Sequence, residues 1–174
     1  MNRRIPFVLA LVAAAAPTLA AAQDGKDFVA AFVDRNAEGY GEIAQQIWDW
    51  AELGYLETRS SELLRRTLAD AGFEVEAGVA GIPTAFVASW SNGEGPVIGI
   101  LAEFDALPGI TQDRVPRRAP IEEKPAGHAC GHHLFGTGST AAAVAVKAWM
   151  EQSGQRGTIR VYGTPAEEGG AGKV

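Results

Sequence analysis

Apolar residues recur at helical spacing in three parts of the chain. This spacing predicts a helical region over residues 28–53, which we expect Gly39 and Gly41 to divide into two helices or to kink. A second helix is predicted over residues 60–71, with a charged outer face. A third, over residues 134–150, is apolar nearly all round, which is typical of a buried helix.

Strand-like segments lie between these helices. Residues 73–79 and 86–90 alternate between apolar and polar side chains, as half-buried strands do. An Asn-Gly turn at residues 92–93 leads into residues 97–101, whose unbroken apolar run predicts a central strand covered on both faces. Residues 158–162 form a further β-rich run. Because strands and helices interleave, we expect an α/β domain with a mixed sheet flanked by helices.

The first 22 residues have the pattern of an export signal. Arg3 and Arg4 precede an apolar stretch over residues 5–16, and the alanines at 20–22 resemble a cleavage site. This stretch is shorter than the roughly 20 residues needed to span a membrane, and Pro17 follows it. We therefore expect a signal peptide, no stable membrane span, and an exported mature chain of residues 23–174, periplasmic or extracellular.

Composition narrows the classes of function. The 174 residues include 15 Lys+Arg and 21 Asp+Glu, for a formal net charge of −6. Nucleic-acid binding requires a basic face, so this balance argues against a nucleic-acid partner. The chain has one cysteine, Cys130, which excludes an internal disulfide and leaves the thiol as a ligand, a nucleophile or a packing residue.

All three histidines and the cysteine lie in one short motif, GHACGHH, at residues 127–133. Imidazole nitrogen and thiolate sulfur are the ligands that borderline metals such as zinc prefer. Cys130 and His132 are two residues apart, so both side chains can reach one site. The alternative is a buried thiol with loop histidines.

Carboxylates follow two of the predicted strands. Glu103 and Asp105 come after the apolar run 97–101, and Glu167 and Glu168 come after the strand at 158–162. In open α/β sheets ligands bind beyond the carboxyl ends of the strands, so these side chains are site candidates. One carboxylate can bind metal while another transfers protons, and Asp105 can orient a ligand histidine.

Together these segments resemble the clan MH dinuclear metallohydrolases, the aminoacylase and carboxypeptidase-like enzymes. The motifs DALPG at 105–109, GHACGH at 127–132, GTGS at 136–139 and PAEEGG at 165–170 occur in the order found there. The resemblance is closest to the amidohydrolase branch that hydrolyses p-aminobenzoyl-glutamate and N-acyl amino acids. It implies the N-terminal part of a metallopeptidase-like catalytic domain, and a metal-dependent amidohydrolase that cleaves an amide between an acyl or aryl group and an amino acid.

The resemblance also implies a role for each motif residue. Cys130 is similar to a thiolate that bridges two divalent ions, of zinc, manganese or cobalt, while His132 and Glu168 resemble further ligands. Glu167 falls at the position of the general base, and Asp105 at that of the residue orienting a histidine. His128, His133 and Glu103 are left as outer-sphere or substrate contacts; His133 stands where relatives often have Asp or Asn.

In the family, two further histidine ligands and a dimerisation or lid domain lie later in the chain. All histidines here fall within residues 128–133, so we expect these 174 residues to form an incomplete catalytic domain that is inactive alone. The complete enzyme is expected to be a homodimer acting on a small amide or peptide-like substrate. The alternative function is a truncated, catalytically inactive metal-binding fragment.

Two further interpretations concern loops. Residues 136–140, Gly-Thr-Gly-Ser-Thr, would cradle a phosphate if they opened a helix, although they lack the lysine of a P-loop. The proline-rich segment 106–127 is long for a loop in a compact domain, which favours a functional role. Its basic side chains would either attract an anionic substrate or lie solvated at the surface; they are Arg114, Arg117, Arg118 and Lys124.

Overall fold

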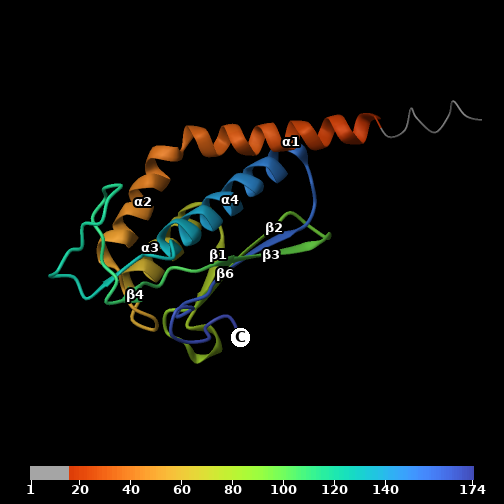
Figure 1. Cartoon of the computed structure of the whole chain (residues 1–174). Coiled ribbons are helices and arrows are strands. Elements are labelled where there is room, and N and C mark those ends of the chain that lie inside the picture. Colours follow the sequence, from red (N-terminus) through yellow and green to blue (C-terminus); the bar gives the residue numbers. More distant parts are fainter. Residues whose placement is uncertain (1–15) are drawn as a thin grey trace, which may run out of the picture.

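The computed structural model describes residues 16–174, with side chains described from Asp24 onward. Helices pack over a four-stranded sheet, and a long first helix lies across the helical layer (Figure 1). Residues 1–15, most of the predicted signal peptide, lie outside the described part, and residues 16–22 belong to this first helix. Within the described part, none of the helices has the length and apolar character to cross a membrane.

The helical region at the N-terminus divides at Asn36 rather than at the glycines. Helix α1 spans Ala16–Arg35 and α2 spans Ala37–Trp50, so Gly39 and Gly41 lie inside α2. The Asn36 side chain donates a hydrogen bond to the Phe32 carbonyl (2.8 Å), which competes with the backbone bonds that would continue α1. Exposed glycines weaken a helix without ending it, which is why the predicted division was wrong.

The other two helices lie close to their predicted positions. Helix α3 (Thr58–Asp70) buries Leu64 and Leu68. Helix α4 (His132–Ser153) buries one face through small residues such as Thr140 and Ala143. The expectation of burial nearly all round was wrong for its first turns, where Leu134 and Phe135 are exposed.

The sheet is mixed, as predicted. Its strands are β1 (Glu74–Ala77), β2 (Phe86–Ser91), β3 (Val97–Ala102) and β6 (Thr158–Gly163), in the order β1-β2-β6-β3. Strands β3 and β6 pair in parallel, while the other pairs are antiparallel. Together with the helices, this confirms the α/β class.

Two details of the predicted strands were wrong. Strand β1 ends at Ala77, and Val79 lies in a short 3₁₀ helix, η1 (Val79–Gly81). Strand β3 is an edge strand of the described sheet, with β6 as its partner, and Val97, Ile98 and Leu101 are exposed. An apolar run predicts contact with apolar groups but does not specify which segment supplies them.

Aromatic packing beneath the end of β6 links the core to the loops that follow the strands. Phe86 and Phe104 are fully buried, and their rings stack 6.1 Å apart. A side chain at Gly163 would meet the Phe86 ring in direct overlap. The glycine therefore lets β6 lie against this ring immediately before residues 164–168.

The parallel pairing of β3 and β6 brings two carboxylate-bearing segments together. Ala102 pairs with Gly163, so residues 103–105 and 164–168 leave the sheet at the same edge. The segment between β3 and α4 is tied at its ends by β4 (Leu107–Pro108) and β5 (Ala126–Gly127), which pair with each other. This short ladder leads the chain back toward the sheet edge at the start of α4.

We expect Gly163→Ala to destabilise the protein by about 1–3 kcal/mol, the usual cost of overpacking a core. Gly138→Ala is the matched control, because Gly138 is an exposed α4 residue with open space around it; there alanine should be neutral or stabilise the helix by up to about 1 kcal/mol. Urea denaturation measures both values. Equal stability of the two variants would contradict the proposed packing.

Candidate metal centre

Six side chains from three segments converge at the carboxyl edge of β3 and β6. One pair follows β3, one pair lies at the start of α4, and one pair follows β6. In that order they are Glu103 and Asp105, Cys130 and His132, and Glu167 and Glu168. All six are residues that the sequence singled out, and the structure brings them together.

His132 lies at the centre of this cluster and is buried. Its Nδ1 atom donates a hydrogen bond to Asp105 Oδ1 over 2.8 Å. Its Nε2 atom lies 3.1 Å from Glu103 Oε2 and 3.9 Å from Glu167 Oε2. With Nδ1 engaged by Asp105, Nε2 is the nitrogen whose lone pair is available to a ligand.

Asp105 joins all three segments through its two carboxylate oxygens. One oxygen accepts from His132, and the other, Oδ2, accepts the backbone N–H of Glu168 at 2.8 Å. The residue is 1% exposed, so both bonds lie away from water. The arrangement fixes the imidazole relative to the backbone that carries Glu168.

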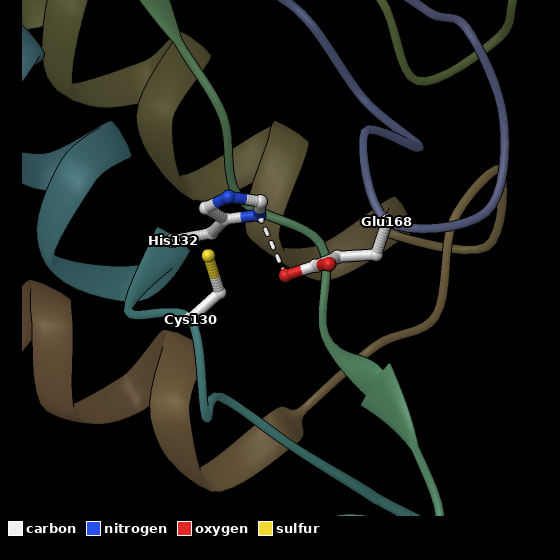
Figure 2. A group of neighbouring side chains, drawn as sticks. All are labelled: Cys130, His132 and Glu168. Atoms are coloured by element: carbon white, nitrogen blue, oxygen red, sulfur yellow. Dashed lines mark ion pairs between the residues drawn. The ribbon is translucent and has the colours of Figure 1, made fainter.

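Cys130, His132 and Glu168 form a compact group of possible ligands (Figure 2). One ligand atom from each residue lies within 4.8 Å of the other two. Glu168 Oε1 lies 3.7 Å from His132 Nδ1, and it is buried without a hydrogen-bond partner. A buried carboxylate oxygen with no donor is costly, and a cation would satisfy it. Sulfur, nitrogen and oxygen donors together suit a borderline divalent metal.

A second group shares the same histidine. Glu103, His132 and Glu167 also offer ligand atoms within 4.8 Å of one another. Here an ammonium group contacts both carboxylates, since Lys173 Nζ lies 2.6 Å from Glu103 Oε1 and 3.2 Å from Glu167 Oε1. Hydrogen bonds to Glu103 and Glu167 raise the pKa of Lys173 above its usual value. One imidazole has one free lone pair, so these two groups cannot each use it for an ion of their own.

The electrostatics of the cluster favour a cation. Loss of hydration and the carboxylates of Glu168, Glu167 and Glu103 raise the pKa of the Cys130 thiol. The thiol is exposed, so the neighbouring negative charges are the physically important cause. A thiolate ligand at this position therefore requires a compensating positive charge.

His128 and His133 lie apart from this cluster, against α2. Their rings are 5.0 Å apart, and His128 Nε2 donates to the Ile47 carbonyl at 3.1 Å. Burial and the neighbouring His133 lower the pKa of His128 to about 4, while burial lowers that of His133. Neither residue is in the two ligand groups of the described chain.

Gly136 does not belong to a phosphate-binding loop. Residues 136–140 lie within α4, which already begins at His132. A Cβ atom on Gly136 would lie 2.6 Å from the Glu103 carbonyl oxygen. This glycine allows α4 to approach the end of β3. The alternative interpretation as a phosphate cradle does not hold, because the helix starts one turn earlier.

Two of the loop's basic residues pack on Trp48. The Arg114 guanidinium lies 6.0 Å and the Lys124 ammonium 4.6 Å from its ring centroid. Lys124 also donates to the Asp49 carbonyl. Arg117 and Arg118 are exposed. In the described structure Arg114 and Lys124 thus hold the loop against α2.

Sequence reasoning missed three residues in and around the site: Lys173, Glu57 and Glu52. Lys173 follows the second glutamate pair in a glycine-rich run, where no periodicity predicts its direction. Glu57 precedes α3 and looks like an ordinary acidic residue at a helix start, yet it is fully buried. The Glu52 carboxylate accepts from the Ser60 N–H (2.8 Å) and from the Ser60 hydroxyl (2.7 Å) at the start of α3.

Comparison with known proteins points to one family. Residues 99–174 match the sequence profile of peptidase family M20/M25/M40. The chain is 47% identical over 149 residues to a subunit of the p-aminobenzoyl-glutamate hydrolase of Escherichia coli, covering 84% of this chain and 31% of that protein. It is 35% identical over 158 residues to the Xaa-Arg dipeptidase of Mus musculus, covering 82% and 32%.

Comparison with solved structures agrees with this family match. A dinuclear metal-binding peptidase of the M20 family from Bacillus subtilis superposes with a TM-score of 0.60 and 28% identity, covering 79% of this chain and 36% of that one. The chain thus spans about a third of the length of the relatives that it matches. The profile match includes every residue of the two ligand groups.

His128 should make stability depend on pH. Its pKa is about 4 in the folded protein against 6.5 for an ordinary histidine, so the unfolded chain binds a proton first as pH falls. Stability from this residue is complete above pH 6.5 and is lost progressively between pH 6.5 and about 4. The free energy of unfolding, measured by urea denaturation at several pH values in this range, should therefore depend less steeply on pH in His128→Gln than in wild type. An equally steep pH dependence in the variant would contradict this role of His128.

Proposed function

The chain belongs to peptidase family M20/M25/M40 through residues 99–174, and we propose that it provides metal ligands and the general base for hydrolysis of an amide bond. The bond lies between an acyl or aryl group and an amino acid, as in p-aminobenzoyl-glutamate or N-acyl amino acids. The similarity to the Escherichia coli p-aminobenzoyl-glutamate hydrolase supports this substrate class. We propose zinc, manganese or cobalt as the metal, with two ions in the complete site.

One observation carries the proposal. Glu168 Oε1 is buried without a hydrogen-bond partner beside a thiol and an imidazole, in a cluster of four carboxylates. Cys130, His132 and Glu168 would hold a divalent ion there, and the fit rests on the chemistry of these donors. When bound, such an ion supplies Lewis-acid activation of water and of the substrate carbonyl.

Asp105 and Glu167 are proposed to orient a ligand and to transfer protons, respectively. Asp105 holds His132 in one orientation by accepting from Nδ1, which leaves Nε2 as the ring nitrogen with a free lone pair. Glu167 has a side chain that is 33% exposed, so it can contact substrate and solvent. In the proposed reaction, a Glu167 carboxylate oxygen accepts the proton of the attacking water and delivers it to the leaving amine nitrogen.

We also propose that the protein is exported through a signal peptide over residues 1–22 and acts as a homodimer. The sequence pattern of residues 1–22 supports export. A small amide substrate, rather than a nucleic acid, agrees with the net charge of −6 on the chain.

Substitutions of the adjacent glutamates Glu167 and Glu168 should have different effects on metal content and turnover. In the complete enzyme, Glu167→Gln is expected to keep the metal bound while turnover falls at least ~10²-fold, since glutamine keeps the size of the side chain but accepts no proton. Glu168→Gln is expected to lower metal content as well as turnover, because it replaces a charged ligand. Metal content by mass spectrometry and hydrolysis of p-aminobenzoyl-glutamate and N-acyl amino acids measure the two effects.

The control for this pair is Glu122→Gln, an exposed acidic residue in the loop before α4. It removes one negative charge outside the cluster and should leave both readouts unchanged. If Glu167→Gln loses metal and Glu168→Gln keeps it, the two roles are exchanged. If both variants keep metal and turnover, the proposed site is wrong.

A further inference from the structure

A buried carboxylate lies behind the pair of glutamates, on the connection between α2 and α3. Glu57 is 0% exposed, and in the described part of the chain it forms no ion pair with a lysine or arginine. Its Oε2 atom accepts a hydrogen bond from the Thr84 hydroxyl at 3.0 Å. Its Oε1 atom accepts the backbone N–H of Ala166 at 2.8 Å, across 109 residues of sequence. Burying a carboxylate completely is costly unless hydrogen bonds of this kind replace its hydration.

Ala166 has an unusual backbone conformation immediately before Glu167 and Glu168. Its φ angle is +57°, in the left-handed region, and the residue is fully buried. This conformation is sterically unfavourable for an alanine, so surrounding contacts must hold it. The Glu57 hydrogen bond is one such contact. Gly54 is another, because a Cβ there would lie 2.9 Å from the Ala166 Cα.

Two hydrogen bonds therefore hold the backbone of residues 166–168, which carries the two glutamates. Glu57 holds the N–H of Ala166, and Asp105 holds the N–H of Glu168. Between these anchors lies Glu167, whose own backbone N–H has no such carboxylate in the described contacts. The turn is thus fixed from both sides while the Glu167 side chain stays partly exposed.

We infer that Glu57 is a positioning residue for the metal ligand Glu168 and the base Glu167, acting through the length of its side chain and its bond to the Ala166 N–H. The inference rests on the proposed function, since it assigns those roles to the glutamates. It does not require Glu57 to touch substrate or metal. It requires only that residue 57 has a side chain long enough to place a hydrogen-bond acceptor at the Ala166 N–H.

Two substitutions separate reach from charge. Glu57→Gln keeps the length and one carbonyl oxygen, which accepts from Ala166 while the new amide group donates to the Thr84 oxygen. Glu57→Asp keeps the charge but shortens the side chain by one methylene, which withdraws the acceptor from Ala166. Thr84→Val is the matched control, because it removes the hydroxyl that donates to Glu57 Oε2 and leaves the bond to Ala166 in place.

The first measurement is hydrogen exchange of the Ala166 amide in the full-length protein without metal. Exchange should be faster in Glu57→Asp than in wild type, Glu57→Gln and Thr84→Val. The second is the affinity for Co²⁺, titrated directly. Glu57→Asp should bind Co²⁺ ~10- to 100-fold more weakly, the usual loss on removing support of a ligand, while the other two variants stay within about threefold of wild type.

Two results would overturn the inference. One is unchanged Ala166 exchange in Glu57→Asp. The other is a loss of Co²⁺ affinity in Glu57→Gln as large as in Glu57→Asp, because charge rather than reach would then be the cause. Glu168→Gln, measured in parallel, tests the proposed function separately. If it binds Co²⁺ as tightly as wild type, Glu168 is not a ligand, whereas the exchange result still decides whether Glu57 holds the turn.

Discussion

The site depends on the carboxylate of Asp105, which ties together three segments that are distant in sequence. Its two oxygens accept from the His132 imidazole at the start of α4 and from the Glu168 backbone after β6. Asp105 itself follows β3, whose parallel pairing with β6 places both segments at one sheet edge. Because the residue is buried, each bond is made without competition from water. The orientation of His132 relative to Glu168 follows from this single side chain.

This geometry places several negative charges close together, and this charge density favours the binding of a cation. Glu103, Asp105, Glu167 and Glu168 surround one imidazole, and Lys173 neutralises the Glu103 and Glu167 side. On the opposite side Glu168 Oε1 remains without a donor, next to the Cys130 thiol. A divalent cation would offset the repulsion and stabilise the thiolate in one step. The charges around the imidazole are therefore asymmetric, because Lys173 contacts Glu103 and Glu167 and not Glu168.

The sequence predicted the class of fold and the members of the cluster, because both follow from local signals. Periodicity identified α3 and the strand segments, and the carboxylates after strands β3 and β6 identified the site edge. Neighbours in three dimensions could not be predicted this way. The edge position of β3 and the burial of Glu57 depend on contacts across many residues. The helix break at Asn36 has a local cause, the side-chain bond to Phe32, which the spacing of apolar residues does not report. The roles of Cys130, His132, Glu167 and Glu168 in catalysis stay predictions, with which the geometry is compatible.

Binding of one divalent cation by Cys130, His132 and Glu168 together is the property on which the proposed function depends. X-ray absorption at the zinc edge of the zinc-loaded protein tests it most directly, since the spectrum counts sulfur ligands. We expect one sulfur at about 2.3 Å, with nitrogen and oxygen ligands at about 2.0–2.2 Å. In Cys130→Ser the sulfur contribution should disappear. A wild-type spectrum containing nitrogen and oxygen ligands alone would contradict this binding mode.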